Sequence, residues 1–395
     1  MKRSMGLIGM MILLLGMLSG CGIVHPSSMD EGSFGFVGGL QSTQPQQRME
    51  PLLPGVTPAI LWGRQQLEPA VQATYDKVSE VVACRQEGPL VVEATPQDLE
   101  LVLHALRIDH PEYFWFDGEA SFVSTELAGV TVSSSCTFTY TMTREEALEQ
   151  AAQVRTYTEN CLNSPELRAA ETDYKKILGV YRFIINNTDY IITEGDQSIL
   201  GVMNAHRGTC AGYARSFQYL MSQLGIPCTL ALGTTSDGNA HGWNMVMCGG
   251  DWYQMDVTWG DPVTPEGEPG TSLQYTYCLL TDEEMYRDHT LDDVLPMPVC
   301  ESTNYNYFIR EGLQFDTWDA ESYEEALSRA VISGEPWFSV RFTGKESYEK
   351  ALEALLGDSQ IMGMLVRCGI LEEDGHKHVS YTQNDLFYEI SIQLS

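Results

Sequence analysis

The chain has 395 residues, and 54 acidic against 23 basic side chains give it a formal net charge of −31 at pH 7. A field of this sign disfavours binding to nucleic acid and to other anionic polymers. The length exceeds that of one usual domain and allows more than one hydrophobic core. We therefore expect several folded modules and no nucleic-acid partner.

Residues 1–20 have the features of a secretory signal. Lys2 and Arg3 precede an apolar stretch at residues 6–18, which is shorter than the ~20 residues of a membrane-spanning helix. The stretch ends in Leu18-Ser19-Gly20-Cys21, which resembles the bacterial lipoprotein processing box. The resemblance implies a lipidated Cys21 that anchors the protein on the extracytoplasmic side of the cell membrane. A plain signal peptide that is cleaved nearby is the alternative.

Residues 21–58 are predicted to form a flexible tether. The segment is rich in Gly, Pro, Ser and Gln and shows little hydrophobic periodicity. A flexible segment of this length has a typical end-to-end reach of roughly 35 Å. A folded body on such a tether would stand clear of the membrane surface.

Residues 59–165 are expected to form an N-terminal α/β module. Thr95, followed by a proline, predicts a capped helix start, and Thr143 predicts a second helix with a capping box. Strands are predicted near residues 121–141. The aromatic residues around His110 are better explained by a core between helix and sheet than by a ligand pocket.

A cysteine lies at the predicted start of a helix in the middle of the chain. Apolar residues follow Cys210 at three-and-four spacing through residues 211–224, and Gly225 and Pro227 end the pattern. Unpaired backbone N–H groups and the positive end of the helix dipole favour a thiolate at such a start. Cys210 is therefore a candidate nucleophile.

A β-hairpin is predicted after this helix. Residues 242–248 and 252–259 have the composition of antiparallel strands, and Gly249 and Gly250 provide a tight turn between them. Two side chains of catalytic type, a histidine and an aspartate, lie near the open end of this hairpin. The position of the turn therefore decides whether these two side chains come into contact.

With the turn centred near Gly250, Asp256 is expected opposite Asn244, and His241 opposite Trp259. Asp256 would then hold one ring nitrogen of His241 while the other nitrogen faces Cys210. This is the arrangement of a catalytic triad with cysteine as nucleophile. Each residue alone also has a purely structural explanation, but the three in this order favour catalysis.

These segments resemble the bacterial transglutaminase-like family of papain-like thiol enzymes. The similar segments are residues 174–190, 210–220, 224–227, 241–244 and 252–262. The resemblance implies an α+β fold, with a nucleophile helix packed on an antiparallel sheet in a catalytic domain at residues 166–290, flanked by smaller α/β modules. It also implies that Cys210 is the nucleophile, His241 the general base and acid, and Asp256 the orienting carboxylate.

One feature departs from the animal transglutaminases. They have a tryptophan upstream of the nucleophile, whereas this chain has none between Trp115 and Trp243. The oxyanion would then be held by the Cys210 N–H and a second donor. Gln197 has the right chemistry for that donor, and an ordinary surface amide is the equal alternative. The departure favours hydrolysis over transfer to an amine.

Residues 291–395 are expected to form a small C-terminal α/β module. Its predicted elements are a strand at residues 337–342, a helix at residues 347–356 and a strand at residues 387–394. His376 and His378 lack a third ligand for a metal ion, and the sequence has no phosphate-binding glycine loop. We expect neither a cofactor nor a metal. Cys228 and Cys248 are either a disulfide or two buried thiols.

The sequence therefore predicts a lipid-anchored thiol enzyme that acts on amide bonds of a protein or peptide, including cell-wall peptide. Water resolving the acyl-enzyme would make it a peptidase or amidase, and an amine would make it a transglutaminase. An inactive module that binds protein or cell-wall material is the alternative. Motifs do not encode the substrate, because specificity lies in loops and pocket shape.

Overall fold

The computed structural model describes residues 50–53, 55–127, 130–191, 197–261, 273–371 and 380–394. They form two compact units, one with residues Leu61–Gln153 and the other with Val154–Ser395. The boundary falls within helix α4 (Arg144–Leu162). Cys21, His376 and His378 lie outside the described residues. Within the described ranges, no helix has the length and apolar character needed to cross a membrane.

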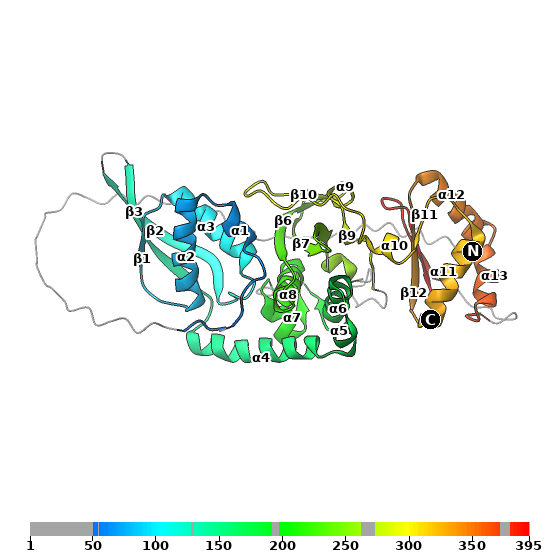
Figure 1. The fold of residues 1–395 in the computed structure, drawn as a ribbon, viewed down its shortest axis with the longest axis horizontal. Coiled ribbons are helices and arrows are strands. Elements are labelled where there is room, and N and C mark those ends of the chain that lie inside the picture. Colours follow the sequence, from blue (N-terminus) through cyan, green and yellow to red (C-terminus); the bar gives the residue numbers. More distant parts are fainter. Residues whose placement is uncertain are drawn as a thin grey trace, which may run out of the picture. The chain divides into compact units, whose positions relative to one another are not determined.

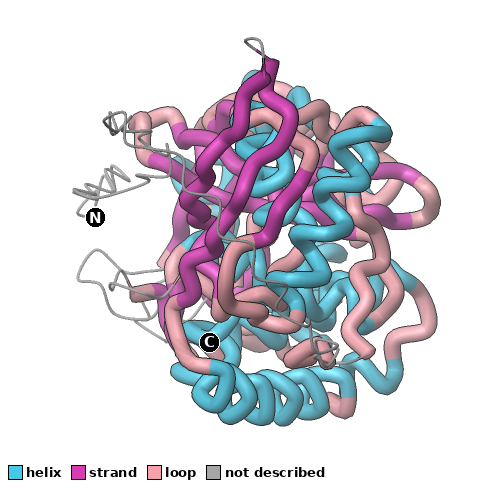
Figure 2. Tube along the Cα trace, turned by 90° about the vertical axis from the view of Figure 1, so that its left-hand side faces the viewer, coloured by secondary structure: helices cyan, strands magenta, loops and turns pink. Residues whose placement is uncertain are grey.

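The N-terminal unit packs helices beside a three-stranded antiparallel sheet with the order β1-β3-β2. Its elements are α1 (Trp62–Gln66), α2 (Pro69–Ala83), β1 (Leu90–Val92), α3 (Pro96–Asp109), β2 (Phe116–Leu127) and β3 (Val130–Tyr140). Strands β2 and β3 run side by side as the long hairpin drawn in magenta in Figure 2. Thr95 caps α3 as predicted, and together with Asp98 it forms a capping box that was not predicted there. His110 is buried and stacks on Tyr113, in agreement with a core role.

The second unit begins with helices that surround one central helix. These are α5 (Pro165–Ala169), α6 (Asp173–Asn186), α7 (Ile199–Ala205) and α8 (Cys210–Gln223), with the short parallel strands β4 (Asp189–Tyr190) and β5 (Arg207–Gly208). Helix α8 is central because Phe217, Leu220 and Met221 lie on one stripe and are completely buried. The expected helix is thus observed, with Cys210 as its first residue, Gln223 as its last and Leu224 as its C-cap.

A five-stranded antiparallel sheet follows, with the order β10-β6-β7-β8-β9. Its strands are β6 (Cys228–Thr235), β7 (Ala240–Cys248), β8 (Asp251–Met255), β9 (Cys278–Leu280) and β10 (His289–Leu291), and η1 (Thr258–Gly260) and α9 (Asp282–Met285) lie between them in the chain. Helix α8 packs against β6 and β7 (Figure 1). The fold is mixed α+β, with the helix that begins at Cys210 packed on an antiparallel sheet, as predicted from the sequence.

The register of the β7–β8 hairpin differs from the expected one by one residue. Gly249 and Gly250 form a two-residue turn, both with positive φ, so the centre of the turn lies between them rather than at Gly250. Asn244 therefore pairs with Met255, and the expected pairing with Asp256 is wrong. Strand β8 ends at Met255, which leaves Asp256 free to turn away from the ladder.

The C-terminal part of this unit has its own four-stranded sheet with the order β11-β12-β14-β13. Its elements are α10 (Tyr307–Arg310), β11 (Gln314–Phe315), α11 (Ala320–Ser333), β12 (Trp337–Phe342), α12 (Lys345–Leu352), η2 (Glu353–Gly357), α13 (Gln360–Arg367), β13 (Tyr381–Asn384) and β14 (Glu389–Gln393). Strand β12 has the predicted bounds. The predicted helix starts earlier, at Lys345, and ends in the π-helical turn η2.

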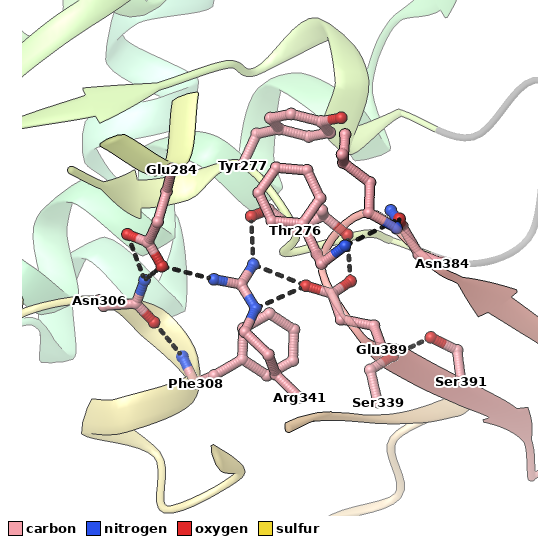
Figure 3. A network of polar contacts seen from close by, with 12 residues as sticks. Thr276, Tyr277, Glu284, Asn306, Phe308, Ser339, Arg341, Asn384, Glu389 and Ser391 are labelled. Carbon is pink, nitrogen blue, oxygen red and sulfur yellow. Dashed lines mark hydrogen bonds and ion pairs between the residues drawn. The ribbon is translucent and has the colours of Figure 1, made fainter. Parts of the chain in front are cut away.

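A buried arginine connects this sheet to the segment that precedes β9. Arg341 on β12 donates to Glu389 on β14 at 2.8 Å, to Glu284 at 3.0 Å and to the Thr276 carbonyl at 2.7 Å (Figure 3). The Thr276 hydroxyl in turn donates to Glu389 at 2.6 Å. These charge-assisted bonds hold the C-terminal sheet against the strands that follow Asp256.

The described cysteines are free thiols. Cys228 lies opposite Val246 rather than opposite Cys248, and both cysteines are buried. Of the two alternatives left by the sequence, the structure has the buried thiols.

Candidate active site

The Cys210 thiol lies at the start of α8, where the chain enters the helix from β5. Gly208 of β5 pairs with Tyr190 of β4. A Cβ atom at Gly208 would lie 2.9 Å from a methyl carbon of Val202, so glycine allows this close approach to α7. Cys210 is only partly buried, and it sits where the unpaired N–H groups and the dipole of α8 favour a thiolate.

Two buried side chains fix α8 against its surroundings. The Asn244 amide on β7 donates to the Ala214 carbonyl at 3.0 Å, and this bond ties the first turns of α8 to the sheet. The Tyr213 hydroxyl lies within hydrogen-bond distance of the Thr188 carbonyl, at 3.1 Å, and of Asp261, at 2.5 Å. The position of Cys210 is therefore set by the packing of α8 and not by a loose loop.

His241 connects the thiol to a carboxylate. It lies on β7 opposite Gly233 of β6, and its Nε2 donates to Asp256 Oδ2 at 2.7 Å. It is also hydrogen bonded to Cys210. The Trp259 ring lies 5.5 Å from the His241 ring and covers one side of it. Trp259 lies in η1 rather than on a strand, so its expected pairing with His241 is wrong.

Asp256 is completely buried and is held by four donors. Its Oδ1 accepts from the backbone N–H groups of Thr258 at 2.9 Å and Trp259 at 3.2 Å. Its Oδ2 accepts from His241 and from a second histidine, His289, at 3.3 Å. The carboxylate can reach these donors because the chain leaves the ladder after Met255 and turns into η1.

The electrostatics of the three residues favour their charged forms. Burial raises the pKa of the Cys210 thiol, but the hydrogen bond and charge of His241, with the Gly242 N–H, lower it below its ordinary value. Burial lowers the pKa of His241, yet Asp256 and then Cys210 raise it to about 10. Burial raises the pKa of Asp256, while His241 and then His289 hold it well below its usual range. The arrangement supports a thiolate–imidazolium pair at neutral pH.

His289 is a residue of the site that was not predicted from the sequence. It lies on β10, 33 residues beyond Asp256, and it reaches the site because β10 pairs with β6. Its Nδ1 is 2.7 Å from Asp288 Oδ1. The adjacent Asp288-His289 pair is the only local signal, and by itself it does not indicate a catalytic site.

The surroundings of Gln197 bear on the expected oxyanion donor, and those of Trp243 bear on whether a tryptophan could line a substrate tunnel. Gln197 is exposed in the turn that precedes α7. Trp243 is completely buried, and its indole N–H donates to Gln254 at 2.7 Å. Trp243 therefore faces the core and is not available to line a substrate tunnel, whereas Trp259 is partly exposed.

Three side chains of the site could in principle hold a metal ion. The ligand atoms of His241, Asp256 and His289 lie within 4.8 Å of one another. Ligands of a tetrahedral zinc ion, at ~2.0–2.1 Å from the metal, lie about 3.3 Å apart. The 2.7 Å between His241 Nε2 and Asp256 Oδ2 is too short for this and fits a shared proton. The donor set is thus better suited to proton transfer than to a metal.

Comparison with known proteins agrees with this geometry. The family model of the transglutaminase-like superfamily matches residues 162–257. The segment contains α6 to β8 and ends one residue after Asp256. The chain therefore contains a transglutaminase-like superfamily domain, and this superfamily indicates a thiol enzyme.

Similar proteins include peptidases and a TGase. Human kyphoscoliosis peptidase is 26% identical over 154 residues, which cover 33% of this chain and 23% of the peptidase. A crystal structure of a TGase has a TM-score of 0.26 and 14% identity, covering 44% of this chain and 51% of that one. A candidate cysteine protease from Cytophaga hutchinsonii has a TM-score of 0.24 and 17% identity, covering 35% and 65%. The chain thus spans about a quarter of the length of the human peptidase.

Proposed function

We propose that this chain is a thiol enzyme that acts on amide bonds through an acyl-enzyme on Cys210. The observation that carries the proposal is the continuous hydrogen-bonded chain from Cys210 through His241 to the buried Asp256. A structural cysteine needs neither a helix start nor an imidazole that is oriented by a carboxylate. Both features activate a thiol as a nucleophile.

The reaction follows from these positions. The Cys210 thiolate attacks the carbonyl carbon of the amide, and His241 gives its proton to the leaving amine, so that a thioester remains on Cys210. A water molecule then attacks the thioester, with His241 as the base, and releases a carboxylic acid and the thiol. The negative oxygen in each step is held by the Cys210 N–H and a second donor, for which Gln197 remains our candidate.

Water is the acceptor that we favour over an amine. A transglutaminase must exclude water long enough for a lysine to attack the acyl-enzyme. An apolar tunnel lined by aromatic side chains helps to exclude water. Trp243 is buried in the core and does not line such a tunnel, and its indole N–H donates to Gln254. The similarity to kyphoscoliosis peptidase also supports a peptide substrate and hydrolysis.

The enzyme is proposed to work on the extracytoplasmic side of the membrane, anchored by a lipid on Cys21. The support is the processing box at Leu18-Ser19-Gly20-Cys21 and the tether composition of residues 21–58. A peptidase in this place would meet proteins of the cell surface and the peptides of the cell wall.

The test gives the full-length protein a peptide substrate together with an excess of a primary amine, and measures hydrolysis against amide formation by mass spectrometry. We expect hydrolysis to exceed aminolysis, with a thioester on Cys210 as the trapped intermediate. Cys210→Ala should abolish both products, whereas the control Cys368→Ala, which changes another partly exposed thiol, should abolish neither.

Two outcomes would replace the proposal. Predominant isopeptide formation would make the protein a transglutaminase with the same nucleophile. Absence of any turnover, with Cys210→Ala still functional in the cell, would leave a binding module. Trapping the acyl-enzyme in a cell-surface extract and measuring the mass of the acyl group by mass spectrometry would identify the natural substrate class.

A further inference from the structure

The second imidazole of the site lies between two carboxylates. His289 Nε2 is 3.3 Å from Asp256 Oδ2, and His289 Nδ1 is 2.7 Å from Asp288 Oδ1. The His289 side chain has no exposed surface. From this geometry we propose that His289 is a permanently protonated positioning residue, which shares the Asp256 carboxylate with His241 and so sets the pH range of the Cys210–His241 ion pair. The inference rests on the proposed function.

The number of acceptors determines the protonation of His289. An ionised carboxylate only accepts hydrogen bonds, whereas a neutral imidazole has one N–H and one bare nitrogen. The Tyr277 hydroxyl lies 2.5 Å from Asp288 Oδ2, so both oxygens of Asp288 have donors. Each nitrogen of His289 therefore needs a proton. The pKa of His289 is accordingly raised: burial lowers it, but the hydrogen bonds to Asp256 and then Asp288 outweigh burial.

The fold holds His289 in this place. Strand β10 pairs with β6 in a register that puts Leu291 opposite Gly233. A Cβ atom at Gly233 would lie 2.0 Å from the Thr290 carbonyl oxygen, so only glycine lets β10 come this close. The centre of the Trp259 ring lies 4.5 Å from that of the His289 ring, so Trp259 packs against another side of His289. A neutral hydrogen-bonding residue would not need two acidic partners at a site that is closed to solvent.

The charges around His289 come from several elements. The titratable groups that face it are His241 on β7, Asp256 after β8, Asp288 beside it, and Tyr277 before β9. With Cys210 as a thiolate, the hydrogen-bonded series of side chains has three negative and two positive charges in alternation. The series runs Cys210, His241, Asp256, His289, Asp288. A cation at His289 weakens the hold of Asp256 on the His241 proton, because one carboxylate oxygen serves both rings. His241 can then release its proton to a leaving amine more readily.

This role predicts a particular change in the pH profile of Cys210 alkylation by iodoacetamide. Removing a positive charge makes every nearby proton bind more tightly. His289→Gln should therefore raise the pKa of Cys210, which sets the lower limb of the profile, and the pKa of His241, which sets the upper limb, so that both limbs move to higher pH. The rings of His241 and His289 are 5.3 Å apart, which corresponds to a shift of roughly 0.5–2 pH units for effective dielectric constants between ~80 and ~20. Asp288→Asn lets His289 become neutral without touching Asp256, and it should shift both limbs in the same direction.

A purely structural role would give a different result. If His289 only kept Asp256 in place, its loss would lower the pKa of His241 and raise that of Cys210, so the two limbs would approach each other. Converging limbs, or an unchanged profile in both variants, would overturn the proposal. His104→Gln, which changes a partly buried histidine of the other unit, and Asp251→Asn, which changes an exposed aspartate, are the matched controls and should leave the profile unchanged.

The wild-type protein gives an independent readout. Nitrogen-15 NMR of the histidines near pH 7.5 should show protons on both ring nitrogens of His289, while His104, whose pKa burial lowers to about 4, should show one. A single proton on His289 would overturn the proposal even if His289→Gln does not fold. A wild-type profile of an ordinary thiol would instead refute the proposed function itself.

Discussion

Replacing Asp256 with asparagine tests the carboxylate that orients His241. An asparagine has one accepting oxygen and one donating NH₂ group, but four donors converge on this position. Whichever way the amide lies, its NH₂ faces N–H groups, and His241 loses the charge that holds its proton. Burial lowers the pKa of His241, but Asp256 and then Cys210 raise it to about 10 from the ordinary 6.5, so the Asp256 carboxylate is the main group that stabilises the imidazolium.

Without that stabilisation the Cys210 thiol should return to a pKa of ~8.5 or above, at which only a few per cent is thiolate at pH 7. We therefore expect Asp256→Asn to slow alkylation of Cys210 at pH 7 by about 30- to 100-fold. Turnover should fall further, by ~10⁴, as it does for the corresponding change in the serine-protease triad.

The assay follows the alkylation of the Cys210 peptide by mass spectrometry, which separates it from the other thiols. Asp251→Asn, an exposed aspartate at the start of β8, is the control and should alkylate at the wild-type rate. A folded Asp256→Asn protein that alkylates within about twofold of wild type would refute the activation argument.

Three further changes test other parts of the account. Gln197→Ala should lower kcat by ~10²–10³ if Gln197 holds the oxyanion, without changing alkylation by iodoacetamide, and an unchanged kcat would remove it from the mechanism. Cys21→Ser should abolish lipid labelling and membrane partition, and an unmodified mature N-terminus elsewhere would exclude the anchor. Arg341→Met leaves Glu389 buried without its partner, and denaturant unfolding should show a loss of about 3–5 kcal/mol that Glu389→Gln partly restores; full stability of Arg341→Met would contradict this.

Local patterns in the sequence predict the parts of the site that lie within single elements. The apolar spacing after Cys210 and the stop at Gly225 predict α8 and put the thiol at its start, where it is observed. The two glycines at 249 and 250 predict the β7–β8 hairpin. The meeting of His241 with Asp256 also follows from the hairpin, although the expected register is off by one residue.

The remaining features depend on contacts that are distant in sequence. Asp256 is placed by the end of β8 and by the backbone donors of η1, and strand periodicity does not predict such a turn. His289 reaches the site through the pairing of β10 with β6, which depends on Gly233. The link from Arg341 on β12 to Thr276 in the turn before β9 joins residues that are 65 positions apart in the sequence. None of these has a local motif.

The central claim is that Cys210 is an activated nucleophile, and its alkylation rate as a function of pH tests this most directly. The lowered pKa of Cys210 predicts a thiolate below the pH at which a free thiol titrates, and the raised pKa of His241 predicts an imidazolium up to about pH 10. The full-length protein should therefore alkylate at Cys210 at a nearly constant rate through neutral pH, and His241→Ala should remove that plateau. A single rise near pH ~8.5, the same in both proteins, would contradict the account.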